Sequence, residues 1–167
     1  RLGAVVQPVL RALADDVEPH YGISTGFGAL ATTFIAEDRR AQLQRSLIRS
    51  HAAGTGAEVE AEVVRALMLL RLSTLCTGRT GVRPVVVETY AAMLNAGITP
   101  IVREYGSLGC SGDLAPLSHI ALAAMGEGTV RVHATEAPGA GLPAAEIAAA
   151  EALAAAGIAP LELAEKE

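Results

Sequence analysis

Apolar residues recur at helical spacing along most of the chain. The pattern begins between Val5 and Val17, where four apolar side chains fall three or four positions apart: Val6, Val9, Leu10 and Leu13. This spacing places side chains on one face of an α-helix. Glu18 and Pro19 interrupt the pattern, so we expect the first helix to end before them.

The same spacing predicts a second helix between Glu37 and Ser50. Its first two residues are acidic, which complements the positive end of a helix dipole. An inward stripe is expected from Leu43, Leu47 and Ile48.

A third helix is predicted between Glu58 and Cys76, ending at Thr77-Gly78. Its apolar residues cover a wide arc, which indicates burial on more than one side. These residues are Val59, Val63, Val64, Leu67, Met68, Leu70 and Leu72.

A fourth helix is expected to start at Pro84, since proline suits a first helical turn, and Gly97 suits the position just past its end. Met93 and Leu94 would close its inward face.

The last third of the chain predicts a helix over Leu114 to Met125, a short strand over Thr129 to His133 and a loop over 134–144. An Ala-rich helix around Ala144 to Ala156 follows. The fold class is therefore mainly α. The final residues, LELAEKE, stop within a helical pattern. We expect residues 1–167 to form a single N-terminal domain of a longer chain whose C-terminal helical part is absent.

Composition narrows the function classes. The chain has 167 residues and is 51% hydrophobic, enough for one sizeable core. Its net charge of -5 is spread over 13 basic and 18 acidic residues, and it offers no basic stripe for nucleic acid. The apolar runs, such as Ala66 to Leu70, are too short to span a membrane, and no signal peptide pattern opens the chain. A soluble, cytoplasmic protein is expected.

The chain has two cysteines, Cys76 and Cys110. They cannot make a disulfide framework, and no Cys/His cluster has zinc spacing, so no metal is expected.

Two Gly-rich stretches break the helical pattern, at residues 20–31 (HYGISTGFGALA) and 106–119 (GSLGCSGDLAPLSH). They can be functional loops or plain helix connections. The first lacks the preceding buried strand and the later acid of a dinucleotide site, and no Gly-Lys-Ser/Thr ending marks a P-loop. In the second, Asp113 stands where a hydrolase nucleophile elbow needs glycine.

Three motifs in order carry a resemblance to a known family: Tyr21 to Gly28, Ser50 to Gly54, and Gly106 to His119. From about Glu18 to Gly128 the chain resembles the aromatic amino acid lyases and, among them, the histidine ammonia-lyases. The resemblance implies elimination of ammonia from L-histidine to give urocanate, in a cytoplasmic homotetramer whose active sites are shared between subunits.

The resemblance also implies a self-made cofactor. In this family an inner tripeptide cyclises to a methylideneimidazolone, and the matching residues are Cys110, Ser111 and Gly112. The family's commonest first residue is alanine. Cysteine is tolerable there because that side chain supplies no ring atom. Glycine lets the backbone fold into the tight turn that cyclisation needs. Neither a nucleotide nor a metal is expected.

The resemblance assigns further roles. Tyr21 matches the catalytic base that takes the β-proton of the substrate, and Ser111 supplies the reactive carbon of the ring. His51 matches a residue that can hydrogen-bond a substrate imidazole. The alternative for His51 is a histidine that caps the helix ending near Ser50. Gly28 and Asp113 are expected to support the loop and the following helix, Asp113 as its N-cap. His20 and His119 are expected to be structural.

Alternatives remain at this stage. An aminomutase, or a tyrosine or phenylalanine ammonia-lyase, would share the same motifs. The 167 residues by themselves can also be a folded but non-catalytic fragment, because further site residues of the family lie C-terminal to anything in this chain.

Overall fold

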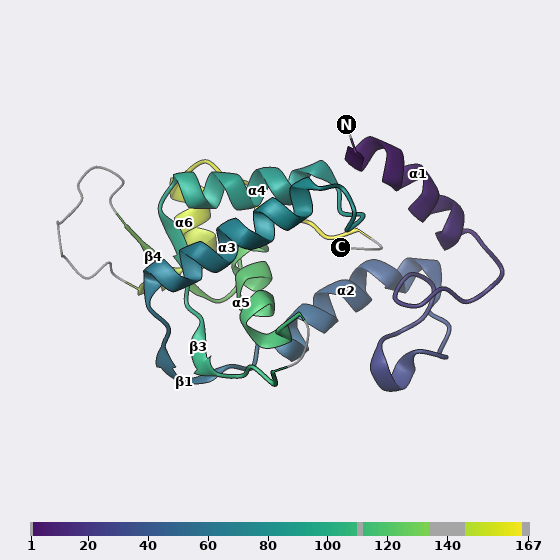
Figure 1. Ribbon diagram of the computed structural model, residues 1–167, viewed down its shortest axis with the longest axis horizontal. Coiled ribbons are helices and arrows are strands. Elements are labelled where there is room, and N and C mark those ends of the chain that lie inside the picture. Colours follow the sequence, from purple (N-terminus) through teal and green to yellow (C-terminus); the bar gives the residue numbers. More distant parts are fainter. Residues whose placement is uncertain (1, 110–111, 134–145, 165–167) are drawn as a thin grey trace.

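A computed structural model describes residues 2–109, 112–133 and 146–164, with the side chains of residues 2–6 left out. This part of the chain is mainly helical, as the sequence predicted (Figure 1). The helices are α1 (Leu2–Ala14), α2 (Glu37–His51), α3 (Ala61–Cys76), α4 (Pro84–Asn95), α5 (Leu114–Ala124) and α6 (Ala149–Ala155), with a 3-10 turn at Gly28–Leu30.

Short strands connect the helices. They are β1 (Thr55–Glu58), β2 (Ile98–Pro100), β3 (Arg103–Tyr105), β4 (Thr129–Val132) and β5 (Glu146–Ala148). β1 pairs with β3, and β2, β4 and β5 form a second sheet in the order β2-β4-β5, with antiparallel neighbours throughout. The strand predicted at Thr129 is confirmed, one residue shorter than expected. The whole of the predicted loop at residues 134–144 lies outside the described residues.

The first helix ends earlier than predicted, at Ala14. Two acids follow at once, and negative charge opposes the dipole at a helix C-terminus. The Asp16 carboxylate accepts a hydrogen bond from the backbone N–H of Glu18 and contacts the His20 ring at 3.0 Å, which favours a turn over a further helical turn. The expected inward stripe is also wrong at Val9, whose side chain is 56% exposed.

Two stretches predicted as helix are strand because partners far away in sequence pair with them. Thr55–Glu58 includes the expected start of the third helix, but it pairs with β3. Glu146–Ala148 lies in the expected Ala-rich helix, but it pairs with β4. Arg131 links the two sheets, since its guanidinium bonds both carboxylate oxygens of Glu58 at 2.9 Å and faces Glu146 in register. That salt bridge holds the pKa of Glu58 below its usual range.

Helix α3 is buried on one side, not on several as predicted. Val64, Met68 and Leu75 are buried, whereas Val63 is 50% and Leu70 is 67% exposed. Within this chain α4 and β2 pack against α3, and they cover one face of it.

The stripe predicted for α2 is partly wrong. Its buried residues are Arg40, Gln44 and Ile48, while Leu43 and Leu47 are only half-buried. Arg40 can be buried because its guanidinium donates to the carbonyl oxygens of Ala14 at 2.9 Å and Ile35 at 3.3 Å. It ties the end of α1 to the start of α2.

The core lies between α3, α4, α5, α6 and the β2-β4-β5 sheet. Its fully buried side chains include Met68, Met93, Ile98, Ile120, Val130 and Leu153. Helix α5 runs through this centre and also packs against α2. In the described part of the chain, no helix combines the length and the apolar character needed to cross a membrane.

Candidate functional site

The loop that carries Tyr21 is anchored to the segment in front of α2. The backbone N–H of Ile35 donates to the Ser24 carbonyl at 2.9 Å, and Thr25 forms a β-bridge with Phe34. The side chains of Ser24 and Thr25 are buried, with polar partners inside the loop. A loop closed in this way can hold one exposed side chain in a fixed place.

Tyr21 is that exposed side chain. It is 60% exposed, although its ring meets Phe27 edge-on with centroids 5.8 Å apart. Its Oη accepts a hydrogen bond from the Gly28 N–H at 3.2 Å. Gly22 is required beside it, because φ is +68° and a Cβ there would lie 2.6 Å from the Phe27 ring. The phenol is therefore oriented by its own loop and points its hydroxyl outward.

His51 is the last residue of α2 and is half-buried. Its Nδ1 lies 2.8 Å from the Leu47 carbonyl oxygen and 2.9 Å from the Ser50 Oγ. A carbonyl can only accept, so Nδ1 carries the proton. In the tautomer with Nδ1 as the donor, Nε2 offers a hydrogen-bond acceptor.

Tyr21 and His51 belong to opposite ends of α2. The Tyr21 loop is bonded to the segment before this 15-residue helix, and His51 closes the helix about 21 Å further on. In Figure 1 the C-terminal end of α2 lies near the start of α5, and the loop that precedes α2 lies at the opposite end of this helix. Among the described residues, the Tyr21 side chain interacts with Phe27 and Gly28, not with His51 or Gly112.

The described residues on both sides of the expected ring have left-handed backbones. Gly109 has φ +65°, Gly112 φ +98° and Asp113 φ +32°, all in the left-handed region. Cys110 and Ser111, between them, lie outside the described residues. A Cβ at Gly112 would meet nothing within 4 Å, so the backbone conformation, not lack of room, calls for glycine. The cyclisation expected of residues 110–112 likewise needs a tight turn, which left-handed glycines permit.

Asp113 stands at the N-cap position of α5, but its side chain makes no capping hydrogen bond. That part of the N-cap prediction is wrong. Capping side chains work from an extended backbone, whereas Asp113 is left-handed with ψ 71°. Its Oδ1 is buried without a hydrogen-bond partner among the described residues. This carboxylate oxygen, unpaired among the described residues and on a strained backbone, stands directly after the residues expected to form the ring.

A contact that sequence reasoning missed joins the second and third motifs. The Gly54 N–H donates to Nε2 of His119 on α5 at 3.0 Å. Burial, and then the positive charge of Arg103, lower the pKa of His119 and keep the ring neutral. Both residues lie in the recognised motifs, but nothing in the sequence indicated that they pair across 65 positions.

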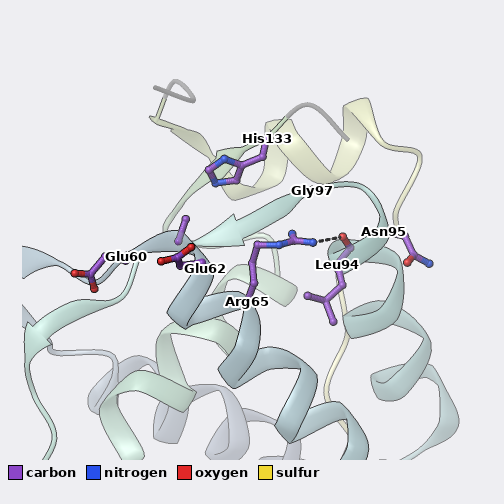
Figure 2. A pocket seen from close by; sticks show the side chains of 8 residues that line it. Glu60, Glu62, Arg65, Leu94, Asn95, Gly97 and His133 are labelled. Atoms are coloured by element: carbon purple, nitrogen blue, oxygen red, sulfur yellow. Dashed lines mark hydrogen bonds between the residues drawn. The ribbon is translucent and has the colours of Figure 1, made fainter. Parts of the chain in front are cut away.

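Among the hollows of the described structure, two lie beside α5 and α3. One, of about 360 Å³, runs along α5 to Gly112 and is bordered by Tyr90, Leu117 and Ser118. The other, of about 700 Å³, lies by the start of α3, where the Arg65 guanidinium donates to the Leu94 carbonyl (Figure 2). None of the predicted site residues lines this second hollow. Among the described residues no cluster of three or more His, Cys, Asp and Glu side chains could hold a metal ion.

Comparisons with known proteins agree with this arrangement. The family model of aromatic amino acid lyases matches residues 2–167. A histidine ammonia-lyase of Streptomyces coelicolor is 61% identical over 165 residues, which is 98% of this chain and 30% of that protein. The chain thus spans about 30% of the length of the curated Streptomyces relatives that it matches.

Solved structures show the same likeness in three dimensions. A histidine ammonia-lyase from Trypanosoma cruzi matches with a TM-score of 0.81 at 33% identity, over 98% of this chain and 29% of that one. A tyrosine aminomutase from Streptomyces globisporus matches with a TM-score of 0.85 at 37% identity, over 99% and 29%. By its sequence and by its fold, the chain belongs to the aromatic amino acid lyase family.

Proposed function

We propose that the protein containing this chain is a histidine ammonia-lyase, which converts L-histidine to urocanate and ammonia. The observation that carries the proposal is the environment of His51. Its protonated Nδ1 is held by the Leu47 carbonyl, so Nε2 can accept the N–H of a substrate imidazole. The Streptomyces relatives at about 60% identity are histidine ammonia-lyases, which supports the same substrate.

The ring-forming residues are proposed to be Cys110, Ser111 and Gly112. The methylideneimidazolone that they would form, with loss of two waters, supplies an electrophilic carbon for labilising the substrate amine. The left-handed backbone at Gly112 and Asp113 supports this assignment. These residues lead straight into α5, whose N-terminal N–H groups and dipole favour negative charge at that point.

Tyr21 is proposed as the base that removes the β-proton. Its oxygen is exposed, and the Gly28 N–H fixes its position without using its lone pairs fully. Since its loop interacts with its own residues, the phenol is available to a substrate held elsewhere. We therefore propose that it serves an active site built with other subunits of a homotetramer, and that the 167 residues alone have little or no turnover. A cytoplasmic location stays a prediction.

The test is product analysis with the purified full-length protein. L-histidine, L-tyrosine and L-phenylalanine are supplied in turn, and products are separated by chromatography with mass detection. Urocanate from L-histidine is expected, with much slower turnover of the other two. A β-amino acid product would identify an aminomutase, and a preference for tyrosine would refute the substrate assignment.

The ring itself is tested by intact mass and peptide mapping across residues 103–131. A deficit of two waters confined to Cys110, Ser111 and Gly112 is expected in the full-length protein. An unmodified peptide in a protein that turns over L-histidine would contradict the proposed electrophile.

A further inference from the structure

His119 lies in the second turn of α5 and is half-buried. Its Nε2 accepts the hydrogen bond from the Gly54 N–H, so this nitrogen carries a lone pair and the ring is neutral. Gly54 follows His51 by three residues, and α5 begins two residues after Gly112. One hydrogen bond therefore links the segment after α2 to the helix that the electrophile loop enters.

The chain is tightly packed at this link. A Cβ on Gly54 would lie 3.0 Å from His119 Nε2, 3.2 Å from the Arg103 Cβ and 3.3 Å from the Tyr105 carbonyl oxygen. These approaches are closer than ordinary van der Waals contact. Gly54 thus needs glycine because three neighbours converge on it.

Gly106 adds a third segment to the same place. A Cβ there would lie 3.0 Å from the Ala115 Cβ and 3.1 Å from the Gly54 Cα. We call Gly54, Gly106, Ala115 and His119 the clasp. It joins the end of the His51 segment to the chain just before the electrophile loop and to the helix just after it.

The backbone between His51 and Gly54 is short and bonded. The Ala52 N–H donates to the Ile48 carbonyl at 2.9 Å, and the Ala53 N–H donates to the His51 carbonyl at 2.8 Å. A displacement of Gly54 is therefore expected to displace the His51 backbone as well, because the intervening residues are held by these hydrogen bonds.

We propose that His119 is a positioning residue: by holding the Gly54 N–H, it sets where the His51 ring lies relative to the electrophile loop. The inference rests on the proposed function, in which His51 recognises the substrate. It gives His119, and the clasp as a whole, a part in substrate recognition without contact to the substrate.

The test uses the full-length protein and steady-state kinetics with L-histidine. His119→Leu removes the acceptor and is expected to raise KM about fivefold, with a smaller change in kcat. A change of this size corresponds to the net free energy that one neutral hydrogen bond contributes. His119→Gln retains an acceptor oxygen at similar reach and is expected to recover most of that loss. Ser73→Ala, at an exposed position on α3 outside these contacts, is the control and should leave KM within about twofold.

A double-mutant cycle separates positioning from a general packing role. In a His51→Ala background the His119→Leu change is expected to have almost no further effect on KM, because the side chain it positions is gone. Fully additive effects, or a Gln variant no better than Leu, would overturn the proposal. Gly54→Ala, which crowds the same contact from the other side, should raise KM in the same direction.

Two readouts keep the outcomes distinct. Each variant is checked for the two-water deficit at residues 110–112; a His119→Leu protein without it would place His119 in ring formation and overturn the positioning role. Wild-type urocanate production decides the proposed function separately. If the wild type acts on another amino acid, the cycle is measured with that substrate, and coupling between His119 and His51 still decides the inference.

Discussion

The two ends of α2 are built in opposite ways. At its C-terminal end, His51 is half-buried and its segment is clasped to α5 through Gly54 and His119. At its N-terminal end, the loop that carries Tyr21 closes on itself and leaves the phenol 60% exposed. The C-terminal end is thus held by contacts within the chain, whereas the N-terminal end carries an exposed tyrosine on a loop that is bonded to its own residues.

This difference fits the proposal that the active site is shared between subunits. A recognition group works best when its position relative to the reacting centre is fixed. The segment of His51, the proposed recognition group, is linked within one chain to α5, which follows the proposed electrophile. An exposed tyrosine on a self-supported loop can be delivered to a neighbouring subunit without rearrangement. The two predicted site residues are therefore expected to serve different copies of the active site.

The largest expected effect comes from Tyr21→Phe in the full-length protein. Loss of a general base should lower kcat by about 10²- to 10⁴-fold. The two-water deficit at residues 110–112 should remain, because the phenol is not linked to that loop in the described chain. Steady-state urocanate assays measure kcat, and intact mass measures the two-water deficit. Near-normal rates would remove Tyr21 from the mechanism.

Mixed assemblies test directly whether Tyr21 and the proposed electrophile at Ser111 come from different copies. Tyr21→Phe and Ser111→Ala subunits, each inactive alone, are coexpressed with different tags and purified as hybrids. If each site takes Tyr21 and the electrophile from different copies, random mixing should restore about a quarter of wild-type activity. Activity no higher than that of the parent variants would show that one copy supplies both groups.

The stiffness of the Tyr21 loop is tested by a matched pair of glycine variants. Gly22 and Gly28 both have left-handed backbones, so Ala costs each about 1 kcal/mol. Only Gly22→Ala also drives a Cβ to 2.6 Å from the Phe27 ring, which should add about 1–3 kcal/mol. Thermal unfolding and kcat should therefore fall further for Gly22→Ala. Equal losses would mean that the Phe27 contact does not order the loop.

The smallest expected effect is a loss of folding stability in mild acid, through His119 at the C-terminal end of α2. Burial and Arg103, itself 3.8 Å from the Glu58 carboxylate, lower the pKa of His119 below its usual 6.5. The unfolded chain then binds a proton more readily than the folded one. The contribution of the neutral ring is fully present above pH 6.5 and is lost as pH falls through the lowered folded value.

The measurement for this prediction is the melting temperature of wild type and His119→Gln against pH. The difference between them should shrink below pH 6.5, where His119 of the unfolded chain takes up a proton before His119 of the folded chain does. Glutamine does not titrate, so the variant lacks this pH dependence. The effect is modest because the ring is only half-buried and solvent screens its charge. A constant difference across pH 5 to 8 would show that His119 does not titrate against the Gly54 contact.

The sequence alone was enough for the elements whose signals are local. Pro84 and Gly97 bracket α4 almost as predicted, and Thr77-Gly78 ends α3, because caps and breakers act over a few residues. The three motifs were also sufficient to recognise the family, since they are contiguous runs of residues.

Only the tertiary structure decided what depends on distant partners. Glu146–Ala148 is strand because β4 offers it backbone hydrogen bonds, which outweigh the helical propensity of an Ala-rich stretch. Asp113 fails to cap α5 because the loop before it leaves its backbone left-handed. The pairing of Gly54 with His119 spans 65 residues, and it forms because α2 and α5 pack together. Neither residue carries a local signal of the other.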